Sequence, residues 1–296
     1  MDAPWSRSCA AALAALCLAA SPGTALAEWV LDHEEVFAGR GELDRTYWDF
    51  ERGHIRNREE QYYQERNVFV EGGVLVFEAR REQVANAAWK AGSRDWRTSR
   101  RTAAYTSGAI VSRRPLHYAR VEVVARSPSG AGVWPAIWLV HEGAVYGEID
   151  MFEAVGKHPD TVFAAVHHGR HARTRKHNNA SLPVPGFEGS WRTHSLEWTP
   201  DRIQVQLDGR TFFTFAPSEA VRDGMDPLRQ PMHLHLNLAL GGSWGGPVDD
   251  SRLPARFEVA SIRVWRWSGR GNPAPAFSGE PAPTQSPPDS IPRWGR

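Results

Sequence analysis

Short apolar or alternating runs recur along this chain, and they constrain its fold more than any other feature. The runs 203–207 and 211–215 flank Asp208-Gly209, a pair with the composition of a two-residue hairpin turn. Alternation with a period of two is typical of strands, and no segment shows a long apolar period of 3.6 residues. Further runs of this kind are residues 68–70, 74–77, 117–126, 133–140, 194–198, 232–240 and 257–267.

Many short strands at hairpin spacing predict an all-β fold, a jelly-roll sandwich of two curved antiparallel sheets. We expect a single domain over residues 28–268, because about 240 residues can build a sufficient core without disulfides. Both cysteines, Cys9 and Cys17, fall within residues 1–27.

Residues 1–27 are predicted to be a secretory signal peptide. Arg7 supplies a positive start, residues 10–20 are apolar, and Thr24-Ala25-Leu26-Ala27 offers a cleavage site. The apolar part is too short for a membrane span, which needs about 20 residues. We therefore expect a secreted protein, extracellular or periplasmic. Residues 269–296 are dense in Pro, Ala, Gly and Ser and predict a disordered tail.

The net charge of the chain indicates which class of molecule it binds. A formal net charge of +1 indicates neither a nucleic acid nor an anionic membrane surface. A neutral polysaccharide or small molecule is the expected partner, and we expect a monomer. The chain has 13 tryptophans, whose flat rings fill cores and also stack on sugars. For any one of them, core filling is at least as good an interpretation.

Three carboxylates, Glu148, Asp150 and Glu153, lie within six residues of an otherwise apolar run. Ionised carboxylates are costly to bury unless they are paired, so the cluster needs either a structural partner or a chemical function. Two carboxyl groups with different proton affinities can cleave a glycosidic bond. The alternative is an edge strand whose acids face water.

The spacing of these acids predicts a bulged strand. Residues two apart in a strand share a face, so Glu148 and Asp150 point the same way, whereas strict alternation turns Glu153 into the core. One extra residue, a β-bulge near Met151 or Phe152, returns Glu153 to that face. A helix would point Glu148 and Asp150 in nearly opposite directions.

The acidic run resembles the E-x-D-x-x-E pattern of glycoside hydrolase family 16, in its bulged, laminarinase-like form. The resemblance extends from about residue 35 to residue 267. Other matching segments, in the family's order, are Glu59-Glu60-Gln61-Tyr62-Tyr63, Asn67-Val68-Phe69-Val70, Tyr105-Thr106-Ser107-Gly108, Trp134-Pro135-Ala136-Ile137-Trp138 and Leu236-Asn237-Leu238-Ala239-Leu240-Gly241-Gly242. It implies a jelly roll whose concave face is a sugar-binding cleft, and endo-acting, retaining hydrolysis of β-1,3 or β-1,4 bonds.

The resemblance also implies roles. Glu148 maps onto the nucleophile, Glu153 onto the general acid/base and Asp150 onto the assisting carboxylate. The implied substrate-binding residues are Trp134, Trp138, Trp244, His167, Asn57, Glu59, Gln61 and Asn237. His233 and His235 share the face of Asn237; we expect them to be solvated, with contact to a distal sugar as the alternative.

The leading hypothesis is a secreted, retaining endo-1,3-β-glucanase. One alternative is hydrolysis of a β-galactan or of mixed-linkage β-1,3-1,4-glucan on the same fold. Another is a carbohydrate-binding relative that has lost catalysis, although the intact set of three acids argues against it.

The chain departs from the family pattern at three places. Laminarinase-like members usually carry Trp-Pro just before the Gly-Glu pair, where this chain has Glu142-Gly143-Ala144-Val145-Tyr146 and no tryptophan. Many carry an arginine where this chain has Ala109, so a cleft arginine is expected to be missing. The calcium site also loses carboxylates, at Glu35-Val36-Phe37 and at Ala260, and a hard cation needs that charge. We predict no metal and no cofactor.

Overall fold

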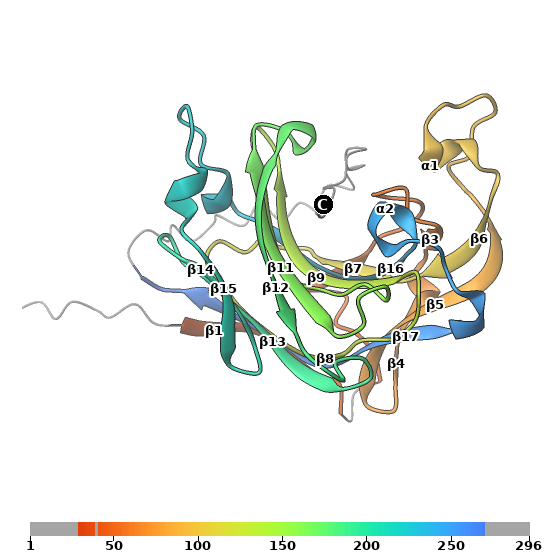
Figure 1. Cartoon of the computed structure of the whole chain (residues 1–296), viewed down its shortest axis with the longest axis horizontal. Coiled ribbons are helices and arrows are strands. Elements are labelled where there is room, and N and C mark those ends of the chain that lie inside the picture. The colour runs from red at the N-terminus through yellow and green to blue at the C-terminus, as the bar shows by residue number, and fades with distance from the viewer. Residues whose placement is uncertain (1–28, 39–40, 270–296) are drawn as a thin grey trace, which may run out of the picture.

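The computed structural model describes residues 29–38 and 41–269, and these fold into two stacked β-sheets (Figure 1). The predicted signal peptide and almost all of the predicted tail lie outside the described residues. The all-β prediction is confirmed, and every run predicted as a strand overlaps an observed strand.

One sheet has ten strands. Its order is β15-β14-β13-β8-β17-β5-β6-β3, with β1 paired to β17 and β4 paired to β5. All of these pairs are antiparallel except β3 with β6. The strands are β1 (Trp29–Val36), β3 (Gln61–Tyr63), β4 (Val68–Glu71), β5 (Val74–Ala85), β6 (Thr102–Ser107), β8 (Ala119–Arg126), β13 (Trp191–Trp198), β14 (Ile203–Leu207), β15 (Arg210–Phe215) and β17 (Ala255–Trp267).

The other sheet has seven strands in the order β12-β11-β10-β9-β16-β7-β2, all antiparallel. They are β2 (Trp48–Phe50), β7 (Ala109–Ser112), β9 (Val133–Glu142), β10 (Tyr146–Glu153), β11 (Thr161–Gly169), β12 (Lys176–Pro183) and β16 (His233–Leu240). Short helical turns complete the described fold: α1 (Trp96–Ser99), α2 (Gly242–Gly245), η1 (Glu65–Asn67), η2 (Ala172–Thr174), η3 (Pro217–Ala220), η4 (Pro227–Arg229) and η5 (Asp250–Arg252).

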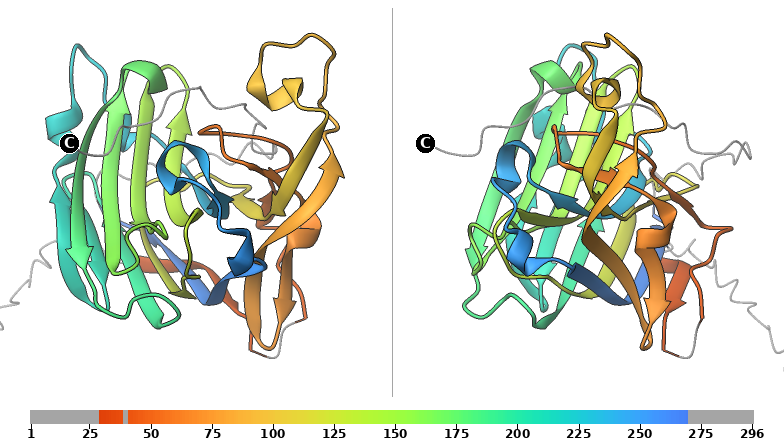
Figure 2. Two further views of the ribbon diagram at one scale, coloured as in Figure 1. Left: turned by 45° about the vertical axis from the view of Figure 1, so that its right-hand side comes forward. Right: turned by 90° about the vertical axis from the view of Figure 1, so that its right-hand side faces the viewer.

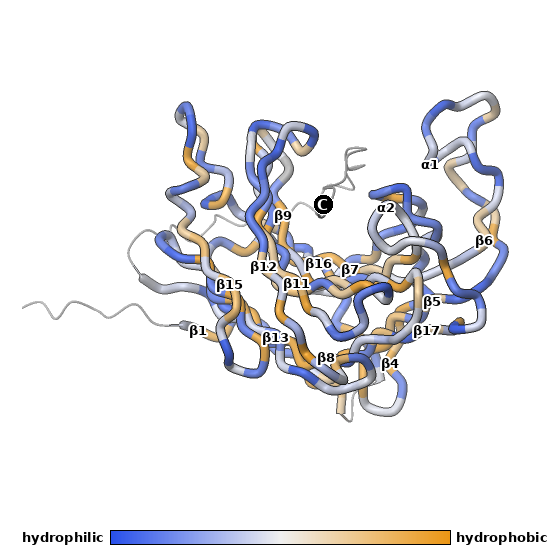
Figure 3. Tube along the Cα trace, in the orientation of Figure 1, coloured by the Kyte–Doolittle hydropathy of each residue, from blue (hydrophilic) through white to orange (hydrophobic). Residues whose placement is uncertain are grey.

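The core lies between the sheets. Val121 and Val123 of β8 meet Ile137 and Leu139 of β9 in one fully buried apolar cluster. Figure 3 shows apolar segments along the strands that face this layer and hydrophilic loops around it. Both sheets curve in the same sense, and the seven-stranded sheet turns its concave face away from the core (Figures 1 and 2). Residues of β9, β10, β11 and β16 that alternate with core residues therefore lie on the concave face.

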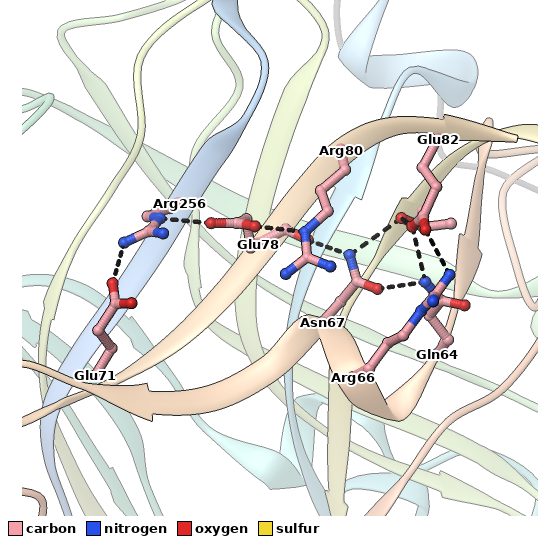
Figure 4. A network of polar contacts seen from close by, with 9 residues as sticks. Gln64, Arg66, Asn67, Glu71, Glu78, Arg80, Glu82 and Arg256 are labelled. Atoms are coloured by element: carbon pink, nitrogen blue, oxygen red, sulfur yellow. Dashed lines mark hydrogen bonds and ion pairs between the residues drawn. The ribbon is translucent and has the colours of Figure 1, made fainter.

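A polar network around β5 connects it to η1, β6 and β17 within the ten-stranded sheet (Figure 4). Asn67, fully buried at the end of η1, donates its amide to the carbonyl of Glu78 at 2.6 Å and to Thr106 Oγ1 at 3.1 Å. Arg256 of β17 donates Nε to Glu78 Oε2 at 2.6 Å. A buried amide with all these partners holds η1, β5 and β6 in one arrangement.

Gly147 shows how tightly β10 packs. A Cβ atom at this position would lie 2.1 Å from the backbone carbonyl oxygen of Pro227 in η4. Only glycine fits there, so β10 can lie directly against the backbone of η4.

We predict that Gly147→Ala lowers the free energy of unfolding by about 1–3 kcal/mol, because the backbone of η4 must move to admit the methyl group. Urea denaturation measures this change. Gly41→Ala is the matched control, since nothing lies within 4 Å of a Cβ at that exposed position. Equal stability of the two variants would contradict the packing argument.

Candidate active site

The predicted bulge is present in β10. Between Asp150 and Glu153 the strand advances three residues, while β9 advances two, from Trp138 to Ala136. The register with β11 shifts at the same place. Met151 and Phe152 are both fully buried in the core. The extra residue therefore returns Glu153 to the concave face, with Glu148 and Asp150.

Each of the three acids has its own polar partner. His167 Nε2 lies 3.1 Å from Asp150 Oδ2 and 3.6 Å from Glu148 Oε1. Trp134 Nε1 donates to Glu153 Oε1 at 3.0 Å. The hydroxyl of Tyr146 donates to Glu148 Oε2. Tyr146 belongs to the stretch 142–146 that lacks the family's tryptophan, and it contributes a hydrogen bond to one of the acids.

Arg175 determines the protonation state of His167. Its Nε–H donates to His167 Nδ1 at 3.3 Å. An arginine can only donate, so in the neutral ring Nδ1 carries no proton and Nε2, which lies 3.1 Å from Asp150 Oδ2, carries it. Burial lowers the pKa of His167 to about 4, although the charge of Glu148 opposes the shift. The ring is therefore a neutral donor near neutral pH.

Burial also separates the acids in proton affinity. It raises the pKa of Asp150 to about 7, against the opposing charge of Arg175. Burial, followed by the negative charge of Asp150, raises the pKa of Glu153 well above its usual range. Glu148 and Glu59 raise it further. A carboxyl group that keeps its proton at neutral pH can act as a general acid.

The three predicted stacking tryptophans differ in their surroundings. Trp138, half-buried, donates Nε1 to Asn237 Oδ1 at 2.9 Å, so both residues lie on the concave face. Trp134 lies beside Glu153. Trp244 is only 4% exposed and packs edge-on against Trp134, with ring centroids 5.2 Å apart. Trp134 is itself only 6% exposed, so the contact makes Trp244 a support for Trp134, and the sugar-stacking role of both stays a prediction.

Asn57, Glu59 and Gln61 form one polar group. Asn57 Nδ2 donates to Glu59 Oε1 at 3.2 Å, and Gln61 Nε2 donates to Glu59 Oε2 at 2.6 Å. Gln61 Oε1 also accepts from the backbone N–H of Leu240 at 2.7 Å, which joins this segment to the end of β16. Burial raises the pKa of Glu59 to about 7. Glu59 is near enough to raise the pKa of Glu153, so the group borders the three acids.

Sequence reasoning missed a second charged group on the same face. Arg56 lies over the Trp138 ring, 4.9 Å from its centroid, and pairs with Glu51. His235 stacks on the same ring at 4.4 Å and is 8% exposed, so the prediction that it is solvated is wrong. His233 is also not free in water, because its Nδ1 lies 2.7 Å from the carbonyl oxygen of Ser112.

The concave face thus has an arginine, although Ala109 lacks one. The backbone N–H of Glu51 donates to the carbonyl of Ala109 at 3.1 Å, so the Arg56–Glu51 pair lies beside that position. Arg56 comes from the segment after β2 and not from β7. Its position in a loop gave no periodic signal that could have identified it.

Within residues 29–38 and 41–269, two groups of side chains have the spacing to hold a metal ion: His33, Glu35 and Asp44, and Glu148, Asp150 and His167. The second group is the cluster of acids itself. In the first, Glu35 Oε1 already accepts from Trp48 Nε1 and from the Asp44 backbone N–H, each at 3.2 Å. A calcium ion prefers an all-oxygen set, which the histidine does not supply.

Comparison with known proteins identifies the family. A family model described as glycosyl hydrolases family 16 matches residues 56–253. A β-glucanase of Rhodothermus marinus is 34% identical over 268 residues, which cover 81% of this chain and 86% of that protein. The chain belongs to glycoside hydrolase family 16.

Solved structures agree with this assignment. The laminarinase from Rhodothermus marinus matches the family 16 chain with a TM-score of 0.66 and 34% identity, covering 82% of this chain and 99% of that one. A structure described with endo-acting O-glycanases of the human gut microbiota that initiate mucin breakdown has a TM-score of 0.75 and 28% identity, covering 84% and 93%. The protein is a glycoside hydrolase with the family's jelly-roll fold.

We predict that Asp150→Asn moves the alkaline limb of the activity profile to lower pH by roughly one unit. The substitution removes a negative charge that holds the proton on Glu153, so Glu153 loses its proton at lower pH. The measurement is kcat/KM between pH 4 and 10. Asp201→Asn, at an exposed position, is the control, and an unmoved limb in Asp150→Asn would argue against the charge coupling.

We also predict that EDTA leaves the melting temperature of the native enzyme within about 1 °C of its value in calcium. The reason is that protein donors already occupy Glu35 and that Ala260 offers only its backbone carbonyl, which accepts from Phe37 N at 3.3 Å. Calorimetry checks this, and a strong drop in EDTA that calcium reverses would contradict it.

Proposed function

We propose that this family 16 enzyme hydrolyses internal β-1,3 bonds of a laminarin-type glucan with retention of configuration. The observation that carries the proposal is the bulge, which puts Glu148 and Glu153 on one face in different electrostatic environments. The similarity to a β-glucanase and to a laminarinase supports the choice of substrate.

The proposed reaction has two steps. In the first, a carboxylate oxygen of Glu148 attacks the anomeric carbon while Glu153 gives its proton to the leaving oxygen, which yields a glycosyl-enzyme ester. In the second, Glu153 takes a proton from water, whose oxygen attacks the same carbon and releases Glu148. Formation of the ester removes the negative charge of Glu148, so Glu153 loses its proton more readily and can act as the base.

Asp150 and His167 would position the nucleophile. His167, held as a neutral Nε2–H donor by Arg175, lies close to both Asp150 and Glu148. Tyr146, two residues before Glu148 in β10, donates to the carboxylate of Glu148. Such fixed donors stabilise an ionised carboxylate without reorganising during the reaction. The neighbouring Trp138 and the Asn57–Glu59–Gln61 group would contact sugars.

A second candidate is a β-galactan or a related glycan on the same site. The surroundings of the acids differ from the family pattern, because the stretch 142–146 has no tryptophan and Arg56 lies over Trp138. The structure described with mucin-degrading O-glycanases matches with a TM-score of 0.75. These observations bear on which sugar the enzyme binds, and the proposed two-step mechanism is the same for either substrate.

We further propose that the enzyme is secreted after cleavage near Ala27, that residues 28–268 form its catalytic domain, and that it acts as a monomer on a polysaccharide. The sequence of residues 1–27 supports secretion. None of the helices in the described ranges is long and apolar enough to cross a membrane.

The substrate prediction is that laminarin is cleaved to oligosaccharides faster than lichenan, agarose or keratan. Product analysis by chromatography checks both the substrate and the endo-action. Faster cleavage of a galactan would select the second candidate, and binding without cleavage of any glycan would overturn the proposed catalysis.

The mechanistic prediction concerns Glu148→Gln and Glu153→Gln, which keep the side-chain shape. Each should lower kcat on laminarin by on the order of 10³-fold or more. Only Glu153→Gln should retain turnover of an aryl glycoside with an acidic leaving group, because that group needs no proton. Glu219→Gln, exposed and distant, is the control; wild-type activity in either test variant would overturn the assigned roles.

A further inference from the structure

Two loops rise on the side of the molecule to which the concave face opens (Figures 1 and 2). One, residues 86–101, joins β5 to β6 and contains α1. The other, residues 170–176, contains η2 and leads from β11 to Lys176, the first residue of the edge strand β12. Arg97 Nε donates to the carbonyl of Ile55 at 2.8 Å, in the segment that follows the opposite edge strand, β2. We call residues 86–101 and residues 170–176 the rim loops.

The rim loops concentrate positive charge. Together they contain nine Lys and Arg residues and one acidic residue, Asp95, so their formal net charge is +8. The whole chain carries only +1, which leaves −7 for all other residues. The near-neutral total, which predicted a neutral partner, therefore conceals a strong separation of charge.

Only some of these cations have an acidic partner: Arg97 pairs with Asp95 at 3.4 Å and Arg100 pairs with Glu60 at 2.6 Å. On the ten-stranded sheet, Arg263 pairs with Glu34 at 2.7 Å and Arg266 pairs with Asp32 at 2.6 Å. In the rim loops, Arg94, Arg101 and Arg170 are exposed, and within residues 29–38 and 41–269 they make no ion pair. The same holds for Arg173 and Lys176. Cations left without acids in this way can take an anion from outside the chain.

The larger loop is held in shape. Asn86, 5% exposed, donates Nδ2 to the carbonyls of Arg97 and Arg100 at 2.7 and 2.9 Å. The backbone N–H of Lys90 donates to the carbonyl of Thr98 at 2.8 Å. Ordering of the backbone before binding lowers the entropy lost when a ligand binds.

We propose that the rim loops bind anionic groups, either sulfate esters or carboxylates, that the glycan carries on sugars flanking the bond to be cleaved. This inference rests on the proposed function. Guanidinium groups match both anions, since two parallel N–H donors meet two oxygens. Trp89 adds a sugar-sized apolar face beside this charge: it is 42% exposed, and Arg101 lies 5.5 Å from its ring centroid.

The test compares laminarin with the same laminarin lightly sulfated or lightly carboxymethylated. At low ionic strength the wild-type enzyme should have a KM several-fold lower for the anionic forms, and added NaCl should remove the difference. Two rim variants, R94Q/R101Q and R170Q/R173Q/K176Q, should each raise KM on the anionic forms by roughly 3–10-fold and leave it unchanged on laminarin. R210Q is the matched control, an exposed arginine of β15 outside the rim loops.

The outcomes separate the two proposals. If neutral and anionic laminarins are cleaved with the same KM, or if the rim variants affect both equally, the rim inference is wrong. A gain with only the sulfated or only the carboxymethylated form supports it and identifies the anion.

If no laminarin is cleaved, the proposed function fails, and binding tests the rim loops by themselves. In affinity electrophoresis through sulfated laminarin, a retardation lost in the rim variants but kept in R210Q supports the inference. Equal mobility of all proteins overturns it.

Discussion

The active face of this enzyme depends on one extra residue in β10. A strand that alternated without interruption would place Glu148 and Asp150 on the concave face and Glu153 in the core, where its charge would have no partner. The bulge buries Met151 and Phe152 instead, so the apolar layer stays filled while the third acid returns to its neighbours. The bulge changes both the face on which Glu153 lies and the register of β10 with β9 after that point.

Electrostatics at this face follow from that geometry. Three buried carboxyl groups cannot all be charged, so burial and mutual repulsion distribute the protons among them. Their donors come from different strands: Trp134 from β9, Tyr146 from β10 itself, and His167 from β11. Because each donor is fixed by a strand, the sheet sets the acid properties of the site, and Arg175 sets the tautomer of the one histidine.

Much of this could be predicted from the sequence, and the physical reason is periodicity. The alternation of β14 and β15, the turn at Asp208-Gly209 and the bulge in β10 all follow from a two-residue repeat or its interruption. Residues placed by loops could not be found in this way. Arg56 reaches Trp138 from an irregular segment, and His235 is buried where it stacks on the same ring. Trp244 had the right residue type, but its environment depends on how α2 packs against Trp134.

The separation of charge has a consequence for how the molecule would approach a charged surface. The rim loops carry +8 and the remaining residues carry −7, and the rim loops lie on the side to which the concave face opens. Near a polyanionic matrix such a body experiences a torque as well as an attraction, and it turns its open face forward before contact. The range of this alignment is about 8 Å at physiological ionic strength. Productive orientation on arrival would then depend on the salt content of the medium, even where the affinity of the bound state does not.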